Sequence, residues 1–193
     1  MEAFFVSTGL VALAEIGDKT QLLAFMLAAR FRKPLPIIAG ILIATLLNHA
    51  AAGAVGAWIT AHVAPELMRW LLGLGFVAMG IWTLVPDRID DEVAGGRGLR
   101  LGVLGTTLVA FFLAEMGDKT QIATVALAAQ FKSLPAVVAG TTLGMMVANV
   151  PAVLLGDRLA HRVPVRLVHG LAALIFIMLG ALVLGGFAQR LGP

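Results

Sequence analysis

The nine residues LAEIGDKTQ (13–21) return as LAEMGDKTQ (113–121), and the two copies differ only at Ile16 and Met116. The match extends to other positions at the same offset of 100 residues, namely Leu27 with Leu127, Ala28 with Ala128, Ala29 with Ala129, Phe31 with Phe131, Gly40 with Gly140 and Gly80 with Gly180. Self-similarity at a fixed offset indicates repeated structural units. The chain is therefore predicted to contain two copies of one unit.

The sequence around the two copies is too apolar for a water-soluble surface. Of the 193 residues, 60% are hydrophobic and 13% are charged, about half the charged share of a soluble domain; the mean hydropathy is +0.96. The absence of cysteine excludes disulfide frameworks, zinc fingers, iron–sulfur clusters and thiol catalysis. A net charge of only +3, with no basic stretch interleaved with aromatics, argues against a nucleic-acid partner. The composition predicts an integral membrane protein.

Six apolar stretches are long enough to be transmembrane helices, which need about 20 mostly apolar residues. Four of them contain no Asp, Glu, Lys or Arg, and these are residues 34–65, 70–86, 133–156 and 167–189. The other two, 3–29 and 101–131, each contain one copy of the motif. Apolar runs of this length, punctuated by Gly and Pro, favour helices over barrel strands. The predicted fold class is an all-α membrane protein with six transmembrane helices.

The basic residues predict that the two copies are inverted in the membrane. Nine Lys and Arg fall in the loops after spans one, three and five, against three on the opposite side. The positive-inside rule then places these loops in the cytoplasm and both termini outside. The basic loop RFRK (30–33) becomes QFKS (130–133), where the loop is expected outside. We therefore predict two inverted three-helix repeats, 1–86 and 101–193, joined by a cytoplasmic linker at 87–100, an arrangement that recurs in transporters.

Each motif places charged side chains near the centre of its span, where one charge costs about 3 kcal/mol. The six residues concerned are Glu15, Asp18, Lys19, Glu115, Asp118 and Lys119. On a continuous helix, Glu15, Asp18 and Lys19 would share one face and Thr20 would point elsewhere. The glycines at 17 and 117 permit a local break of the kind that exposes backbone carbonyls to ions. Such costly charges indicate a function.

These charges suit one divalent cation, because four carboxylates and two lysines sum to −2. Carboxylate and amide oxygens are ligands for hard cations such as Ca²⁺, Mn²⁺ or Mg²⁺. The predicted ligands are Glu15, Asp18, Gln21, Glu115, Asp118 and Gln121. Met116 is a weak indication for Mn²⁺. Crowded carboxylates in a low dielectric also hold protons more tightly, so protons and metal would compete for the same oxygens.

Other residues have less specific interpretations. In the structural alternative, Glu15–Lys19 and Glu115–Lys119 are i,i+4 ion pairs that stabilise helices. Accessory roles are assigned to Asn48 and Asn149, as ligands or ordinary interhelical hydrogen bonds, and to His49, as a structural or proton-relay residue. Solvated or interfacial roles are expected for His62, His161 and His169 near span ends. Close helix packing is expected at Gly73, Gly75, Gly80, Gly170 and Gly180.

The paired Glu-x-Gly-Asp-Lys-Thr motifs, one in the first span of each half, resemble those of the GDT-type cation/proton exchangers. That family includes Golgi manganese and calcium transporters and bacterial manganese exporters, within the lysine-exporter superfamily. The resemblance implies cation binding by the four acidic residues, with motif partners Gly17, Lys19, Thr20, Gln21, Gly117, Lys119, Thr120 and Gln121. The short linker and lack of a targeting extension resemble a prokaryotic plasma-membrane member.

We therefore expect a secondary transporter, not an enzyme, that exports a divalent cation in exchange for protons by alternating access. The expected substrate is Mn²⁺ first and Ca²⁺ second, without a permanent cofactor. Expected partners are protons and lipid, with homo-oligomerisation left open. One alternative is an amino-acid exporter of the lysine-exporter type, whose carboxylates would bind an ammonium group. An intramembrane aspartyl protease fits poorly because residue 15 is Glu and the chain has no Tyr. A subunit that only stabilises a complex is the third alternative.

Overall fold

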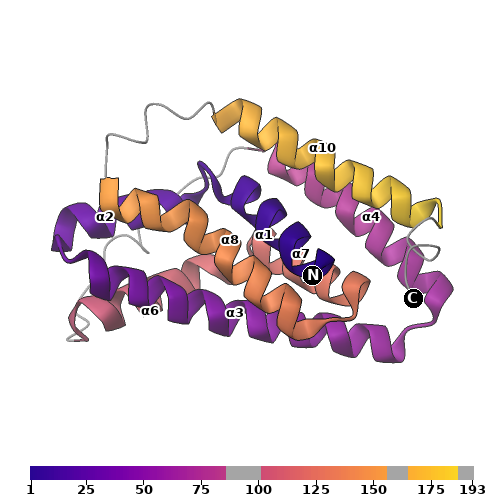
Figure 1. Ribbon diagram of the computed structural model, residues 1–193, viewed down its shortest axis with the longest axis horizontal. Helices are drawn as coiled ribbons and strands as arrows, with labels where there is room; N and C mark the ends of the chain where they lie inside the picture. Colours follow the sequence, from indigo (N-terminus) through magenta and orange to yellow (C-terminus); the bar gives the residue numbers. More distant parts are fainter. Residues whose placement is uncertain (86–100, 156–164, 187–193) are drawn as a thin grey trace.

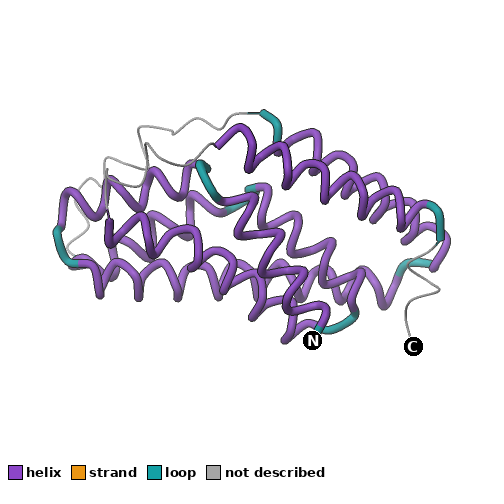
Figure 2. Tube along the Cα trace, turned by 45° about the horizontal axis from the view of Figure 1, so that its top comes forward, coloured by secondary structure: helices purple, strands orange, loops and turns teal. Residues whose placement is uncertain are grey.

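The computed structural model describes residues 1–85, 101–155 and 165–186, in which all regular structure is helical (Figures 1 and 2). The helices are α1 (Glu2–Glu15), α2 (Lys19–Phe31), α3 (Pro34–His62), α4 (Pro65–Thr83), α6 (Gly102–Glu115), α7 (Lys119–Phe131), α8 (Leu134–Leu155) and α10 (Val165–Leu184). The all-α prediction is confirmed for this part of the chain. The predicted linker at 87–100 lies outside the described residues, as does His161.

Three of the described helices, α3, α8 and α10, are long and apolar enough to cross a membrane. The two predicted spans that carry the motif are each divided into two helices, α1 with α2 and α6 with α7. These four helices have 13 or 14 residues, so each rises about 20 Å and falls short of a bilayer core of about 30 Å. The chain is a helical membrane protein, and the count of six spans stays a prediction.

The glycine of each motif produces the break between its two helices. α1 ends at Glu15 and α6 at Glu115, and the chain then turns at Gly17 (φ +85°) and Gly117 (φ +76°). Backbone in this left-handed region is costly for residues with a Cβ atom and open to glycine. Of the two arrangements left open by the sequence, the structure has the local break at the glycine, so Glu15, Asp18 and Lys19 do not share one face of a continuous helix, and Asp18 lies in the turn as the N-cap of α2.

The first helix of each half packs against the long third helix of the other half in the same way. α1 packs along α8 of the other half, and α6 packs along α3. The close approach uses one glycine in each case, since Gly140 lies against the Phe4 carbonyl and Gly40 against the Leu104 carbonyl. These residues are 100 positions apart in the two halves, so the repeated sequence makes the same contact twice.

The helices α4 and α10 form an antiparallel pair along one side of the molecule (Figure 1). Gly73 and Gly180 approach each other's backbone, and Gly80 approaches the Ala173 carbonyl. The predicted packing role is thereby confirmed at these glycines. It is wrong at two others, Gly75 and Gly170, because no described atom lies within 4 Å of where their Cβ would be.

Candidate functional site

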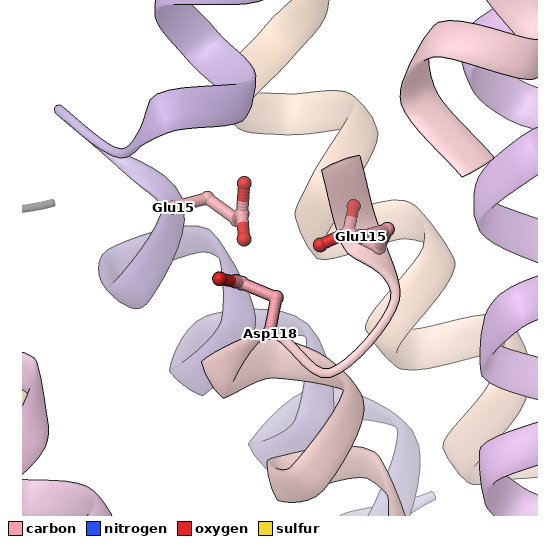
Figure 3. A group of neighbouring side chains, drawn as sticks. All are labelled: Glu15, Glu115 and Asp118. Carbon is pink, nitrogen blue, oxygen red and sulfur yellow. The ribbon is translucent and has the colours of Figure 1, made fainter. Parts of the chain in front are cut away.

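The two helix breaks bring three carboxyl groups together in the interior. Glu15 ends α1, Glu115 ends α6, and Asp118 is the N-cap of α7. One oxygen from each residue lies within 4.8 Å of the others, and Figure 3 shows the three groups directed toward one another. All three residues are buried. We call these residues the carboxylate cluster.

The lysines of the motifs form ion pairs that cross between the two halves. The Lys19 Nζ lies 2.8 Å from Asp118 Oδ1, and the Lys119 Nζ lies 3.2 Å from Asp18 Oδ1. Asp18 faces Lys119 and is not part of the carboxylate cluster. The alternative of i,i+4 pairs within each motif requires a continuous helix, which the break removes. The crossed pairs instead connect residues about 100 positions apart.

The two crossed ion pairs differ in their exposure to the surroundings. The Lys19 side chain is 27% exposed, whereas Lys119 and its partner Asp18 are each 1% exposed. A charge removed from water to this extent requires opposite charge nearby. Loss of either member of the Asp18–Lys119 pair should therefore lower the stability more than loss of Lys19.

The threonine of each motif reaches back across its break to the glutamate. The Thr20 hydroxyl donates to Glu15 Oε2 at 2.5 Å, and the Thr120 hydroxyl donates to Glu115 Oε1 at 2.9 Å. Both threonines are buried. The break explains this contact, because on a continuous helix Thr20 would point elsewhere.

The glutamines of the motif hold the broken backbone. The Oε1 atoms of Gln21 and Gln121 accept hydrogen bonds from the N–H groups of Gly17 (2.9 Å) and Gly117 (2.7 Å). The Gln21 amide also donates to the Ala148 carbonyl at 2.9 Å. These oxygens are thus already engaged by backbone, and their role as metal ligands stays a prediction.

The accessory residues lie on α3 and α8. Asn48 donates to the Phe112 carbonyl at 3.1 Å, and the Gln121 amide donates to Asn48 Oδ1 at 3.4 Å. Asn149 donates to the Met145 carbonyl of its own helix at 3.1 Å. His49 is buried, and neither ring nitrogen has a hydrogen-bond partner within the described ranges. Asn48 is therefore connected to the second motif through Gln121.

Two side chains have surroundings that the sequence analysis did not predict. Met116 is 58% exposed, so its thioether lies apart from the buried carboxylates and does not support a softer metal. His169, which was expected near a solvated span end, hydrogen-bonds through Nε2 to the Ile16 carbonyl at 2.7 Å. Sequence reasoning missed this contact with the first break.

The four acidic residues each keep a buried oxygen that has no hydrogen-bond partner in the described part of the chain. These atoms are Glu15 Oε1, Asp18 Oδ2, Glu115 Oε2 and Asp118 Oδ2. An ionised oxygen buried without a donor or counter-ion is costly by several kcal/mol. Either a hard cation or protons would satisfy such oxygens. The arrangement can therefore bind a divalent cation and protons in competition.

Comparison with known proteins gives matches over nearly the whole chain. The family model described as "Divalent cation/proton antiporter GDT1" matches residues 3–91 and 103–189. A Vibrio cholerae protein named "Putative manganese exporter" is 46% identical over 180 residues, covering 93% of this chain and 88% of the relative. "GDT1-like protein 5" of Arabidopsis thaliana is 28% identical over 221 residues, covering 93% and 94%. "GDT1-like protein 3" of Oryza sativa subsp. indica is 27% identical, covering 91% and 71%. No solved structure gives a significant match.

Proposed function

The chain belongs to the GDT1 family of divalent cation/proton antiporters, and we propose that it exports Mn²⁺ in exchange for protons. Members of this family are cation/proton transporters, so the chain is a transporter and not an enzyme. The 46% identical relative carries manganese in its name, which supports Mn²⁺ as the substrate. Ca²⁺ is the second candidate, because oxygen ligands suit both ions. The family match favours a cation over the amino-acid alternative.

The observation that carries the proposal is the group of partnerless oxygens in the carboxylate cluster. Glu15, Glu115 and Asp118 are buried, their oxygens lie within 4.8 Å of one another, and each keeps one oxygen without a donor in the described residues. A divalent cation between them would balance this negative charge with the ligand type that it prefers. We propose Glu15, Glu115 and Asp118 as primary ligands, with Asp18 as a further acidic group of the site.

Protons drive the exchange by competing for the same oxygens. Expelling a dication against a membrane potential costs about 4.6 kcal/mol per 100 mV, twice the value for one charge. Protons that enter from outside neutralise the carboxylates, weaken the metal site and release the ion. The lysines that face Asp18 and Asp118 limit the negative charge that remains when the metal leaves.

The membrane arrangement is part of the same proposal. Six spans in two inverted repeats would place the two breaks near mid-membrane, with the termini outside and residues 87–100 in the cytoplasm. The plasma membrane is the proposed location. Supporting observations are the helices that start 100 residues apart, such as α3 at Pro34 and α8 at Leu134, and the asymmetric distribution of basic residues.

The test is ⁵⁴Mn²⁺ uptake into everted vesicles that hold an acidic interior. We expect Glu15→Gln and Asp118→Asn to lower uptake by more than about 100-fold, which is the upper end of the effect typical of a residue behind the ligands. Glu2→Gln is the matched control, because Glu2 is an exposed carboxylate on the same helix as Glu15. Dissipating the pH gradient should abolish uptake by the wild type. Undiminished uptake in both cluster variants would refute the site, and uptake that is indifferent to the gradient would refute the exchange.

A further inference from the structure

The α4–α10 pair is placed asymmetrically on helices that otherwise pack in corresponding ways. It packs against α1 of the first half and α7 of the second half. Their counterparts by the offset of 100 residues are α6 and α2, and neither makes a comparable contact with α4 or α10 in the described structure. Figure 1 shows the pair reaching beyond the middle of the molecule toward one end only. The pair therefore covers α1 of the first repeat and α7 of the second repeat. In the described structure it does not cover their counterparts, α6 and α2, in the same way.

The beginning of α10 covers the first break. His169 donates through Nε2 to the Ile16 carbonyl at 2.7 Å. The Val165 side chain lies against Gly17 so closely that a Cβ atom there would collide with it. A helix break leaves carbonyl groups without their helical donors, and His169 supplies one. The first break is closed by this contact.

The second break has the same local fold, and none of the described residues covers it in this way. At Gly117 a Cβ atom would meet no described atom within 4 Å, and the adjacent Met116 is 58% exposed. The Lys119 side chain, which reaches from the second motif to Asp18 at the covered break, is buried, whereas the Lys19 side chain, which reaches from the first motif to Asp118 at the second break, is 27% exposed. In the described part of the chain, one break is thus closed and the other is open.

Arg69 stands in α4 where His169 stands in α10. Arg69 and His169 are separated by the 100-residue offset of the repeat, so they occupy equivalent positions in α4 and α10. Both side chains are hydrogen-bond donors. In this structure Arg69 contacts the exposed Glu66 of its own helix, and its buried Nε has no partner among the described residues. Arg69 also lies over the Trp70 ring, so it would exchange these local contacts within α4 for a carbonyl elsewhere.

We propose that α4 and α10 move as one unit between two positions and cover the two breaks in turn. In the position seen here, His169 binds the Ile16 carbonyl; in the other, Arg69 binds the Met116 carbonyl. The backbone contact of Gly73 with Gly180 and the stacked Phe76 and Phe176 rings keep the pair together. The inference rests on the proposed function, because it supplies the alternating access that an exchanger needs. His169 and Arg69 are positioning residues that act through the breaks.

The natural absence of cysteine allows a direct test by cross-linking. One variant carries Ile16→Cys with His169→Cys, and a second carries Met116→Cys with Arg69→Cys. We expect a short thiol-reactive cross-linker to join both pairs in native vesicles and to stop transport in each case. The four single-cysteine variants, treated alike, should remain unlinked, and the cross-linker should leave the transport rate of each of them as it was before treatment. A second pair that never links in a transporting protein would refute the movement, as would full transport by the linked first pair.

The cross-linking result is independent of which ion is carried. If both pairs link but the wild type moves neither Mn²⁺ nor protons, the proposed function fails and the movement stands. If Mn²⁺ exchange is observed but the second pair never links, the function stands and the movement fails.

A second measurement uses His169 without cross-linking. Loss of one hydrogen bond should shift the balance between the two positions about fivefold. We expect His169→Ala to change the apparent KM for Mn²⁺ in opposite directions in everted and right-side-out vesicles. His169→Arg, which keeps a donor and copies Arg69, should restore the wild-type values. His62→Ala is the matched control, because His62 also binds a carbonyl, that of Trp58, within its own helix. Equal shifts on both faces, or no shift, would overturn the role.

Discussion

The two helix breaks are nearly identical in sequence and differ in their surroundings. Residues 13–21 and 113–121 differ at one position, and both segments turn at a glycine with positive φ. The first break is covered by Val165 and His169, whereas the second has an exposed Met116. Local geometry therefore follows the repeated motif, while exposure follows the placement of α4 and α10. Matched substitutions in the two breaks measure how much the placement of α4 and α10 contributes to stability and to Mn²⁺ transport.

The largest difference is expected between the two lysines. Lys119→Met removes a buried charge that faces the buried Asp18 and should lower the free energy of unfolding by about 3–5 kcal/mol. Lys19→Met removes a charge that is 27% exposed, so a smaller loss is expected than for Lys119→Met. Thermal unfolding of the two purified variants in the same detergent compares them. Equal losses would show that the two breaks have the same surroundings.

The motif glycines should show a smaller difference. An alanine in left-handed backbone costs about 1–2 kcal/mol at either position. Gly17→Ala also collides with Val165, which adds about 1–3 kcal/mol of overpacking, so it should be the less stable variant. Gly75→Ala is the control, because it lies in a helix with open space around it and should be neutral or slightly stabilising. If Gly117→Ala is as unstable as Gly17→Ala in the same unfolding assay, the cover over the first break is absent.

The smallest difference between the two breaks is expected at the threonines. Thr20→Val and Thr120→Val each remove a hydroxyl that donates to a cluster glutamate, and a hydrogen bond to a charged group contributes about 1.5–3 kcal/mol. The bond from Thr20 is the shorter, so Thr20→Val should raise the KM for Mn²⁺ more. Thr83→Val serves as the control, since its buried hydroxyl donates to Met79 within α4. A KM that Thr83→Val changes as much would show that the effect is unrelated to the cluster.

Much of the site could be predicted because its members are encoded locally. The repeated motif identified the acidic residues, and the glycines at 17 and 117 permitted a break at the observed place. The repeat could not reveal that Asp18 lies apart from the cluster, or that the lysines pair across the halves, because both depend on how the two motifs meet in space. The surroundings of Met116 and His169 could not be predicted for a related reason. The position of α10 determines which break is covered, and no local pattern encodes that position.

The most direct measurement is an anomalous-scattering map from crystals of the protein soaked in Mn²⁺. The account predicts one interior peak, bounded by carboxylate oxygens of Glu15, Glu115 and Asp118, that is lost in Asp118→Asn. A Mn²⁺ peak elsewhere in the protein interior, with none between these three residues, would contradict it.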